Sequence, residues 1–167
     1  DLSKMESGDL EWNMMPLDLA GVIDGAVAAS SPLAQAAGVR LDTELSDGLP
    51  GVVADRDRLI QGLVNLISNA VKFCDPAVGR VRISAEAGDG VVTVSVADNG
   101  PGVAAIDRDR IFERFQQGSS GESLINKPKG TGLGLAICRE IVDRFGGRIW
   151  VEAEEGRGSV FRFTLPV

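Results

Sequence analysis

Hydrophobic positions along the chain follow two periods, one typical of helices and the other typical of strands. Apolar residues spaced three and four apart predict helices over residues 19–38, 55–73 and 132–145, and a shorter helix over 109–115. Asp18 and Asp55 stand where N-cap residues are expected, and the pair Gly146-Gly147 is expected to end the last long helix.

Alternation of polar and apolar residues predicts the strands. They are expected at 10–17, 39–45, 52–54, 81–85, 92–96, 148–154 and 159–165. Pro16 is expected to stop the first strand, and Gly88-Asp89-Gly90 predicts a hairpin turn. The polar, aperiodic segment 116–129 is expected to be a mobile loop. Together these elements predict the α+β class, a two-layer sandwich with a mostly antiparallel sheet and helices on one face.

Composition narrows the possible functions. The 167 residues carry 17 Lys and Arg against 24 Asp and Glu, a net charge of −7, which argues against nucleic-acid binding. Without any histidine, the chain cannot form a Ser-His-Asp triad, a Cys-His pair or a histidine-based zinc site. Cys74 and Cys138 fall in apolar helical patterns and are expected to be buried thiols.

Length and the chain's first residues set further expectations. A chain of 167 residues predicts one domain, or one domain with a short appendage. No apolar run reaches the roughly 20 residues of a membrane helix, so no direct membrane contact is expected. The chain opens on Asp1 with no signal peptide. The absence of an initiator Met suggests a piece of a longer protein.

Three polar residues share one face of the helix predicted over 55–73. Asn65, Asn69 and Lys72 are spaced four and seven apart, and this face lies opposite the apolar stripe. Such a face is often simply solvated. Alternatively, two amides and a lysine form a surface that binds phosphate oxygens or a cation such as Mg²⁺, which prefers oxygen ligands.

A second motif, Asp98-Asn-Gly-Pro-Gly102, follows a predicted strand directly. It is either an ordinary turn or a site for a flat ring. In the second interpretation the Asp98 carboxylate accepts a hydrogen bond from the exocyclic amino group of adenine, while the carbonyl of guanine would be repelled. Gly100 and Gly102 would allow the backbone to approach the ring closely.

A third motif, Gly130-Thr-Gly-Leu-Gly-Leu135, opens the last helix. Its spacing differs from both the Walker A and the Rossmann patterns. It is either a flexible joint or a phosphate-binding turn, in which free backbone amides at a helix start attract an anion. Lys127 and Lys129 would add positive charge to such a site. The fourth motif, the glycine turn Gly156-Arg-Gly158, alone predicts only a hairpin.

In this order, the four motifs resemble the N, G1, G2 and G3 boxes of the catalytic and ATP-binding domain of bacterial sensor histidine kinases. The segment Ile111–Phe115 is similar to the F box of that family. The resemblance covers about residues 18–167 and implies the Bergerat-type ATP-binding fold, with a mobile lid at 116–131 that orders over ATP. Residues 1–9 resemble the end of a dimerisation helix, so 10–167 would form the catalytic and ATP-binding domain.

The resemblance also implies cofactors and residue roles. The cofactors would be ATP and Mg²⁺, with Asn69 as the metal ligand, Asn65 and Lys72 as catalytic residues near the phosphates, and Asp98 reading adenine. The other residues expected to bind the cofactor are Phe73, Gly100, Gly102, Val103, Lys127, Lys129, Gly130, Thr131, Gly132, Leu133, Gly134 and Thr164, the last through a water.

Two positions depart from related patterns. ATP hydrolases of the wider superfamily carry a glutamate as general base where this chain has Asn65, and asparagine cannot act as a base at neutral pH. Many histidine kinases place an arginine near the phosphates where this chain has Gln116-Gln117. Whether Lys127 or Lys129 compensates is open.

The expected function is therefore transfer of the ATP γ-phosphate to a histidine outside this chain. The expected partners are the phosphoacceptor histidine domain of the parent protein and a response-regulator receiver domain. The fragment is expected to be monomeric and cytoplasmic, and the parent homodimeric; membrane anchoring of the parent is open. Three alternatives remain: a docking module of the same fold without kinase activity, an ATP hydrolase, and a serine kinase that inhibits a sigma factor.

Overall fold

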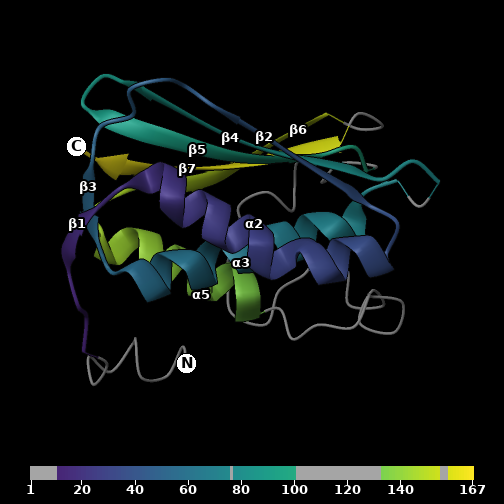
Figure 1. Ribbon diagram of the computed structural model, residues 1–167, viewed down its shortest axis with the longest axis horizontal. Helices are drawn as coiled ribbons and strands as arrows, with labels where there is room; N and C mark the ends of the chain where they lie inside the picture. The colour runs from purple at the N-terminus through teal and green to yellow at the C-terminus, as the bar shows by residue number, and fades with distance from the viewer. Residues whose placement is uncertain (1–10, 76, 101–132, 155–157) are drawn as a thin grey trace.

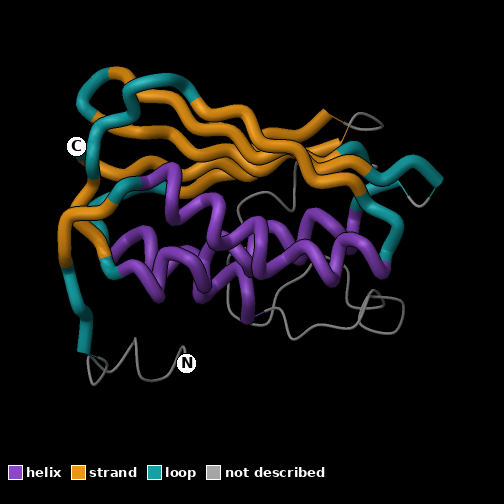
Figure 2. The backbone as a smooth tube through the Cα atoms, viewed as in Figure 1, coloured by secondary structure: helices purple, strands orange, loops and turns teal. Residues whose placement is uncertain are grey.

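The computed structural model describes residues 11–75, 77–100, 133–154 and 158–167, apart from the side chains of residues 133, 153 and 154. A sheet forms one layer, and the helices of the described chain form the other (Figures 1 and 2). These helices are α2 (Leu19–Ala36), α3 (Arg56–Phe73) and α5 (Leu133–Arg144). The predicted helices on one face of a mostly antiparallel sheet are thus confirmed.

The main sheet has the strand order β2-β4-β5-β7-β6. Its strands are β2 (Arg40–Leu45), β4 (Arg80–Gly88), β5 (Val91–Asp98), β6 (Ile149–Glu154) and β7 (Gly158–Pro166). The pairs β4–β5, β5–β7 and β6–β7 are antiparallel, whereas β2 runs parallel to β4. A separate small sheet joins β1 (Met15–Leu17) to β3 (Val52–Ala54). The predicted elements at 1–9, 109–115 and 116–129 lie outside the described residues.

Local signals fix the element boundaries as the sequence predicts. The Asp18 carboxylate accepts from the backbone N of Ala20 at 3.3 Å, and the Asp55 carboxylate accepts from the backbone N of Arg58 at 3.1 Å. Asp89 and Gly90 both have positive φ, 56° and 79°, the geometry of a type I′ hairpin turn.

Pro16 departs from its prediction. It does not stop the first strand but lies within β1, paired with Val53. An edge strand tolerates proline because the missing N–H can face away from the partner strand.

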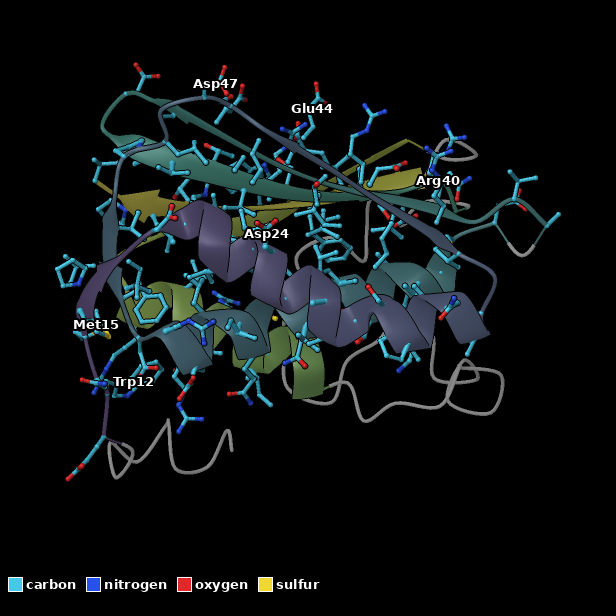
Figure 3. All side chains as sticks on the ribbon, viewed as in Figure 1. Trp12, Met15, Asp24, Arg40, Glu44 and Asp47 are labelled. Carbon is cyan, nitrogen blue, oxygen red and sulfur yellow. The ribbon has the colours of Figure 1, made fainter. Side chains whose placement is uncertain are left out.

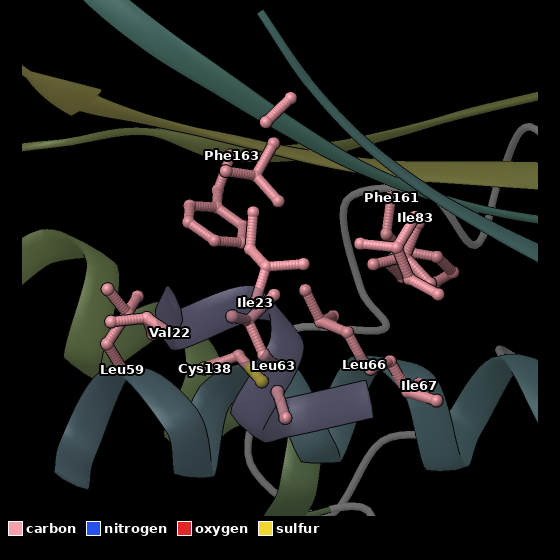
Figure 4. Packing of buried hydrophobic residues seen from close by; sticks show 14 of the residues in the cluster. Val22, Ile23, Leu59, Leu63, Leu66, Ile67, Ile83, Cys138, Phe161 and Phe163 are labelled. Atoms are coloured by element: carbon pink, nitrogen blue, oxygen red, sulfur yellow. The ribbon is translucent and has the colours of Figure 1, made fainter. Parts of the chain in front are cut away.

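The hydrophobic core lies between the helices and the sheet. Leu66 and Ile67 of α3 face Ile83 and Phe161 of the sheet, and Leu63 lies beside Ile23 and Cys138, all 3% exposed or less (Figure 4). Burying side chains of this size stabilises the fold by about 1.5–3 kcal/mol each. This core fixes the end of β5 against α3, which matters for the site below.

Both cysteines are buried and free, as predicted. The Cys138 thiol donates to the backbone O of Gly62 at 3.1 Å, which ties α5 to α3. Burial raises the pKa of Cys138 to about 12, so the thiol is protonated and unreactive at neutral pH.

The segment before β1 is fixed to the ends of α3 and α5. The Trp12 ring packs edge-on against Phe145 at 5.7 Å, and the Arg144 guanidinium lies 5.3 Å from the Trp12 ring centre. Figure 3 shows Trp12 at this end of the molecule and Glu44 projecting from the opposite, sheet side. Of the helices in the described ranges, none is long and apolar enough to cross a membrane.

Candidate functional site

Asp98 is a carboxyl group buried at the end of β5. Its side chain belongs to a residue only 7% exposed. The Ser159 hydroxyl donates to Oδ2 of Asp98 at 2.9 Å, and the backbone N of Gly100 donates to Oδ1 at 2.9 Å. Ser159 stands opposite Asp98 in the β5–β7 pairing, so the sheet register itself brings the two together.

The surroundings of this carboxyl raise its pKa above the ordinary value of 3.8. Burial is the largest cause, and the hydrogen bonds from Gly100 and Ser159 oppose it. A carboxylate offers about four acceptor positions, and these hydrogen bonds do not use all of them. Asp98 therefore has acceptor capacity left for a donor brought by a ligand.

Gly100 presses the turn after β5 directly against the C-terminal end of α3. A Cβ built on Gly100 would overlap the backbone carbonyl of Phe73 and lie 3.0 Å from Oδ1 of Asp98. No residue with a side chain fits this position without moving the backbone. The structure thus brings the Phe73 backbone, Asp98 and Gly100 together at the end of β5.

Asn65 joins α3 to the start of α5. Its side-chain Nδ2 donates to the backbone O of Gly134 at 3.3 Å, across 69 residues of sequence. Gly134 lies in the first turn of α5, where backbone N–H groups have no partner within the helix. Asn65 therefore fixes the position of a helix start that can attract an anion.

The other two candidate residues of α3, Asn69 and Lys72, lie on the same side of the helix as Asn65. Asn69 is half-buried and follows Asn65 by one helical turn, whereas Lys72 is exposed in the last turn. The amide oxygen of Asn69 is a ligand type suited to Mg²⁺. The described residues hold no cluster of three or more His, Cys, Asp or Glu that could bind a metal ion.

Thr164 does not lie at this site, and its expected contact with the base was wrong. On β7 it pairs with Thr93, whereas Asp98 pairs with Ser159 five residues away, a distance of about 17 Å along a strand. The Thr164 hydroxyl oxygen instead accepts from the backbone N of Arg148 at 3.1 Å.

Ser159 is a residue of this candidate site that sequence reasoning missed. It follows the glycine turn of the fourth motif directly. Its position opposite Asp98 follows from the register of β5 with β7. The sequence pattern predicts both strands but does not give that register.

The remaining candidates fall outside the described residues or at their border. Leu133 begins α5, but its side chain is outside the description. The candidates outside are Gly102, Val103, Lys127, Lys129, Gly130, Thr131 and Gly132.

The chain is similar to known proteins over most of its length. A family model described as "Histidine kinase-, DNA gyrase B-, and HSP90-like ATPase" matches residues 54–167. The adaptive-response sensory kinase SasA of Prochlorococcus marinus (strain CCMP1986) is 36% identical over 171 residues, which cover 98% of this chain and 44% of SasA. The chain thus spans less than half the length of this curated relative.

Solved structures of histidine kinases are also similar to this chain. Full-length ShkA in complex with AMPPNP superposes with a TM-score of 0.84 and 38% identity, covering 98% of this chain and 33% of ShkA. The nucleotide-free catalytic domain of the histidine kinase ThkA superposes with a TM-score of 0.77 and 30% identity, covering 92% of this chain and 95% of that domain. ThkA in complex with the response regulator TrrA superposes with a TM-score of 0.73 and 27% identity, covering 99% of this chain and 46% of ThkA.

Proposed function

The chain belongs to the histidine kinase-, DNA gyrase B- and HSP90-like ATPase family, and from this premise we propose that it transfers the γ-phosphate of ATP to a histidine outside it. The fold is that of the ATP-binding catalytic domain of histidine kinases. The chain itself contains no histidine, so the phosphate acceptor must lie on another segment or another protein.

The observation that carries this proposal is the buried carboxyl of Asp98. Ser159 and Gly100 hold both of its oxygens, yet acceptor capacity remains. A ligand that donates an N–H, such as the amino group of adenine, satisfies this carboxylate, whereas the carbonyl of guanine is repelled. The close contact of Gly100 with the Phe73 carbonyl fixes the turn that carries this carboxylate against the end of α3.

The phosphate end of the site lies along α3 and at the start of α5. In the proposal, Asn69 ligates Mg²⁺, and Lys72 lies near the phosphates together with the first turn of α5, which Asn65 holds in place. When bound, Mg²⁺ neutralises the charge of the phosphate oxygens. Catalysis then consists mainly of positioning and charge neutralisation. Because Asn65 cannot remove a proton from water, the site favours transfer to a protein nucleophile over hydrolysis.

The proposed partners follow from this reaction. One is the phosphoacceptor histidine domain of a longer, homodimeric parent protein, and the other is the receiver domain of a response regulator. ThkA, which shares this fold, forms a complex with its response regulator TrrA, and this supports the second partner. The fragment alone is proposed to be monomeric and cytoplasmic.

The first test is calorimetric titration with a non-hydrolysable ATP analogue and Mg²⁺. We expect micromolar or tighter binding, selective over the matching GTP analogue and weakened by Asp98→Asn. The variant keeps the size of the side chain but replaces one acceptor oxygen with a donor. A folded chain that binds neither nucleotide would favour the docking module instead.

The second test measures the reaction. With labelled ATP and the parent protein's histidine-bearing helical segment added in trans, we expect an acid-labile phosphate on that segment. Steady release of phosphate in the absence of an acceptor, abolished by Asn65→Ala, would identify an ATP hydrolase and overturn the kinase proposal.

A further inference from the structure

One amide side chain connects the loop after α3 to the turn that carries Asp98. Oδ1 of Asn99 accepts from the backbone N of Asp75 at 3.2 Å and from the backbone N of Arg80 at 3.1 Å. Its Nδ2 donates to the backbone O of Val78 at 2.5 Å. Asn99 thus binds the backbone at three positions between the end of α3 and the start of β4.

The loop also has internal support that does not depend on Asn99. Oδ1 of Asp75 accepts from the backbone N of Ala77 at 2.7 Å and from that of Val78 at 3.1 Å. These hydrogen bonds lower the pKa of Asp75, so its carboxylate stays ionised near neutral pH. Removing the Asn99 side chain should therefore detach the loop from the turn without dissolving the loop.

Asn99 lies in the chain between the two residues that form the Asp98 end of the site, so its hydrogen bonds affect their position. Its neighbours are Asp98, the buried acceptor, and Gly100, whose N–H holds that acceptor at 2.9 Å. Gly100 also touches the Phe73 carbonyl at the end of α3. The turn is therefore held against α3 by a steric contact at Gly100 and by the hydrogen bonds of Asn99.

We propose that Asn99 is a positioning residue for base recognition: its amide fixes the end of α3 relative to the Asp98 carboxylate. This inference rests on the proposed function. An amide is required because the loop offers two donors and one acceptor, and a single amide side chain can satisfy all three. Without it, only the contact at Gly100 holds the turn against α3, so the separation of Asp98 and Phe73 varies more and the site loses part of its fit to adenine.

The test is Asn99→Ala, titrated with non-hydrolysable analogues of ATP and GTP and with ADP. We expect the dissociation constants of the ATP analogue and of ADP to rise by the same factor, on the order of tenfold, because the base end is affected and the phosphate end is not. Binding of the GTP analogue should hardly change, so selectivity for adenine falls.

Two further variants separate positioning from general destabilisation. Ser30→Ala removes one side-chain hydrogen bond, from Ser30 Oγ to the backbone O of Ala26 at 2.9 Å, within α2 and away from the site. It should leave affinity and selectivity unchanged, whatever its melting temperature. Asn99→Asp keeps the acceptor oxygen and loses the donor, and it should recover part of the selectivity.

The outcomes are distinguishable. Wild-type binding that is selective for adenine, with Asn99→Ala equally selective, would overturn this inference and leave the proposed function intact. An equal loss for adenine and guanine nucleotides would also overturn it, because it would show general damage. Wild-type protein that binds no nucleotide would overturn both.

Discussion

Strands β5 and β7 pair along their whole length. A hydroxyl residue of β7 lies near each end of this pair, but the two hydroxyls have different hydrogen-bond roles. At one end the Ser159 hydroxyl donates to the buried Asp98 carboxylate at 2.9 Å. At the other end the hydroxyl oxygen of Thr164 accepts from the backbone N of Arg148 at 3.1 Å. A glycine lies tightly against the backbone at each end: Gly158 against Asp98, and Gly147 against Thr164.

The difference between the two ends separates the proposed binding site from a structural contact. At the Thr164 end the hydroxyl accepts from the backbone N of Arg148, and the backbone N of Thr164 donates to the backbone O of Arg148, so the contact serves the fold. At the Asp98 end burial raises the pKa of the carboxyl, which means that ionising it in the folded protein costs stability. Polar groups that cost stability without completing the fold are typical of functional sites.

The largest effect is expected from Gly100→Ala. The new methyl would overlap the Phe73 carbonyl, so the turn must move away from α3. We expect a loss of about 1–3 kcal/mol in unfolding free energy and a loss of more than about 100-fold in affinity for the ATP analogue. Thermal unfolding and calorimetric titration measure the two effects.

Gly88→Ala is the matched control for that variant. A Cβ on Gly88 would meet no atom within 4 Å, and the residue does not have positive φ. Stability and affinity should both stay close to wild type. If Gly100→Ala also bound the analogue normally, the pocket would not lie between Phe73 and Asp98.

The next effect is the pH dependence that Asp98 confers. Its folded-state pKa is raised above 3.8, so the folded protein holds this proton more tightly than the unfolded chain. As the pH rises from 3.8 through the raised pKa, the stability contributed by Asp98 should fall. Adenine affinity should rise over the same window, because only the carboxylate accepts a hydrogen bond on both oxygens.

Asp98→Asn isolates this behaviour. We expect its affinity at neutral pH to fall by about 10- to 100-fold, the effect of losing a hydrogen bond to a charged acceptor worth about 1.5–3 kcal/mol. Its melting temperature at neutral pH should not be below that of the wild type, because a buried charge is removed. A variant that keeps the wild-type pH profile of binding would show that another group controls adenine affinity.

Local sequence signals were sufficient for most of the fold. The N-caps Asp18 and Asp55 and the Asp89-Gly90 turn act over a few residues, and the structure has them where they were predicted. The helical period also placed Asn65 and Asn69 on one face of α3, since that placement needs only 3.6 residues per turn.

Contacts between distant segments could not be predicted in this way. The bond from Asn65 to Gly134 spans 69 residues and depends on how α5 packs on α3. The choice between Ser159 and Thr164 depends on the register of β5 with β7, which the alternating pattern of β7 does not contain. Both hydroxyls sit in that strand, and only pairing shows which one reaches Asp98.

Ser159→Ala tests the Asp98 end of the β5–β7 pair with a smaller change. The variant removes one donor to the Asp98 carboxylate and leaves the backbone N of Gly100 as a donor to its other oxygen. We expect the affinity for the ATP analogue to fall by about tenfold, and the pKa of Asp98 to rise further because a bond to the charged form is lost. Titration across pH should therefore show adenine binding failing at a higher pH than in the wild type, and an unchanged profile would contradict the assigned contact.

Thr164→Val tests the other end and should have the smallest effect on the site. The change removes the acceptor for the backbone N of Arg148, an exposed hydrogen bond that water can replace in part. We expect the unfolding free energy to fall by about 0.5–1.5 kcal/mol, with no change in nucleotide affinity or in its pH profile. Because Thr164 and Ser159 lie on the same strand, a general weakening of β7 would affect binding in both variants. Loss of affinity in Ser159→Ala alone would therefore assign the nucleotide site to the Asp98 end of the β5–β7 pair. Equal losses in both variants would remove the distinction between the two ends.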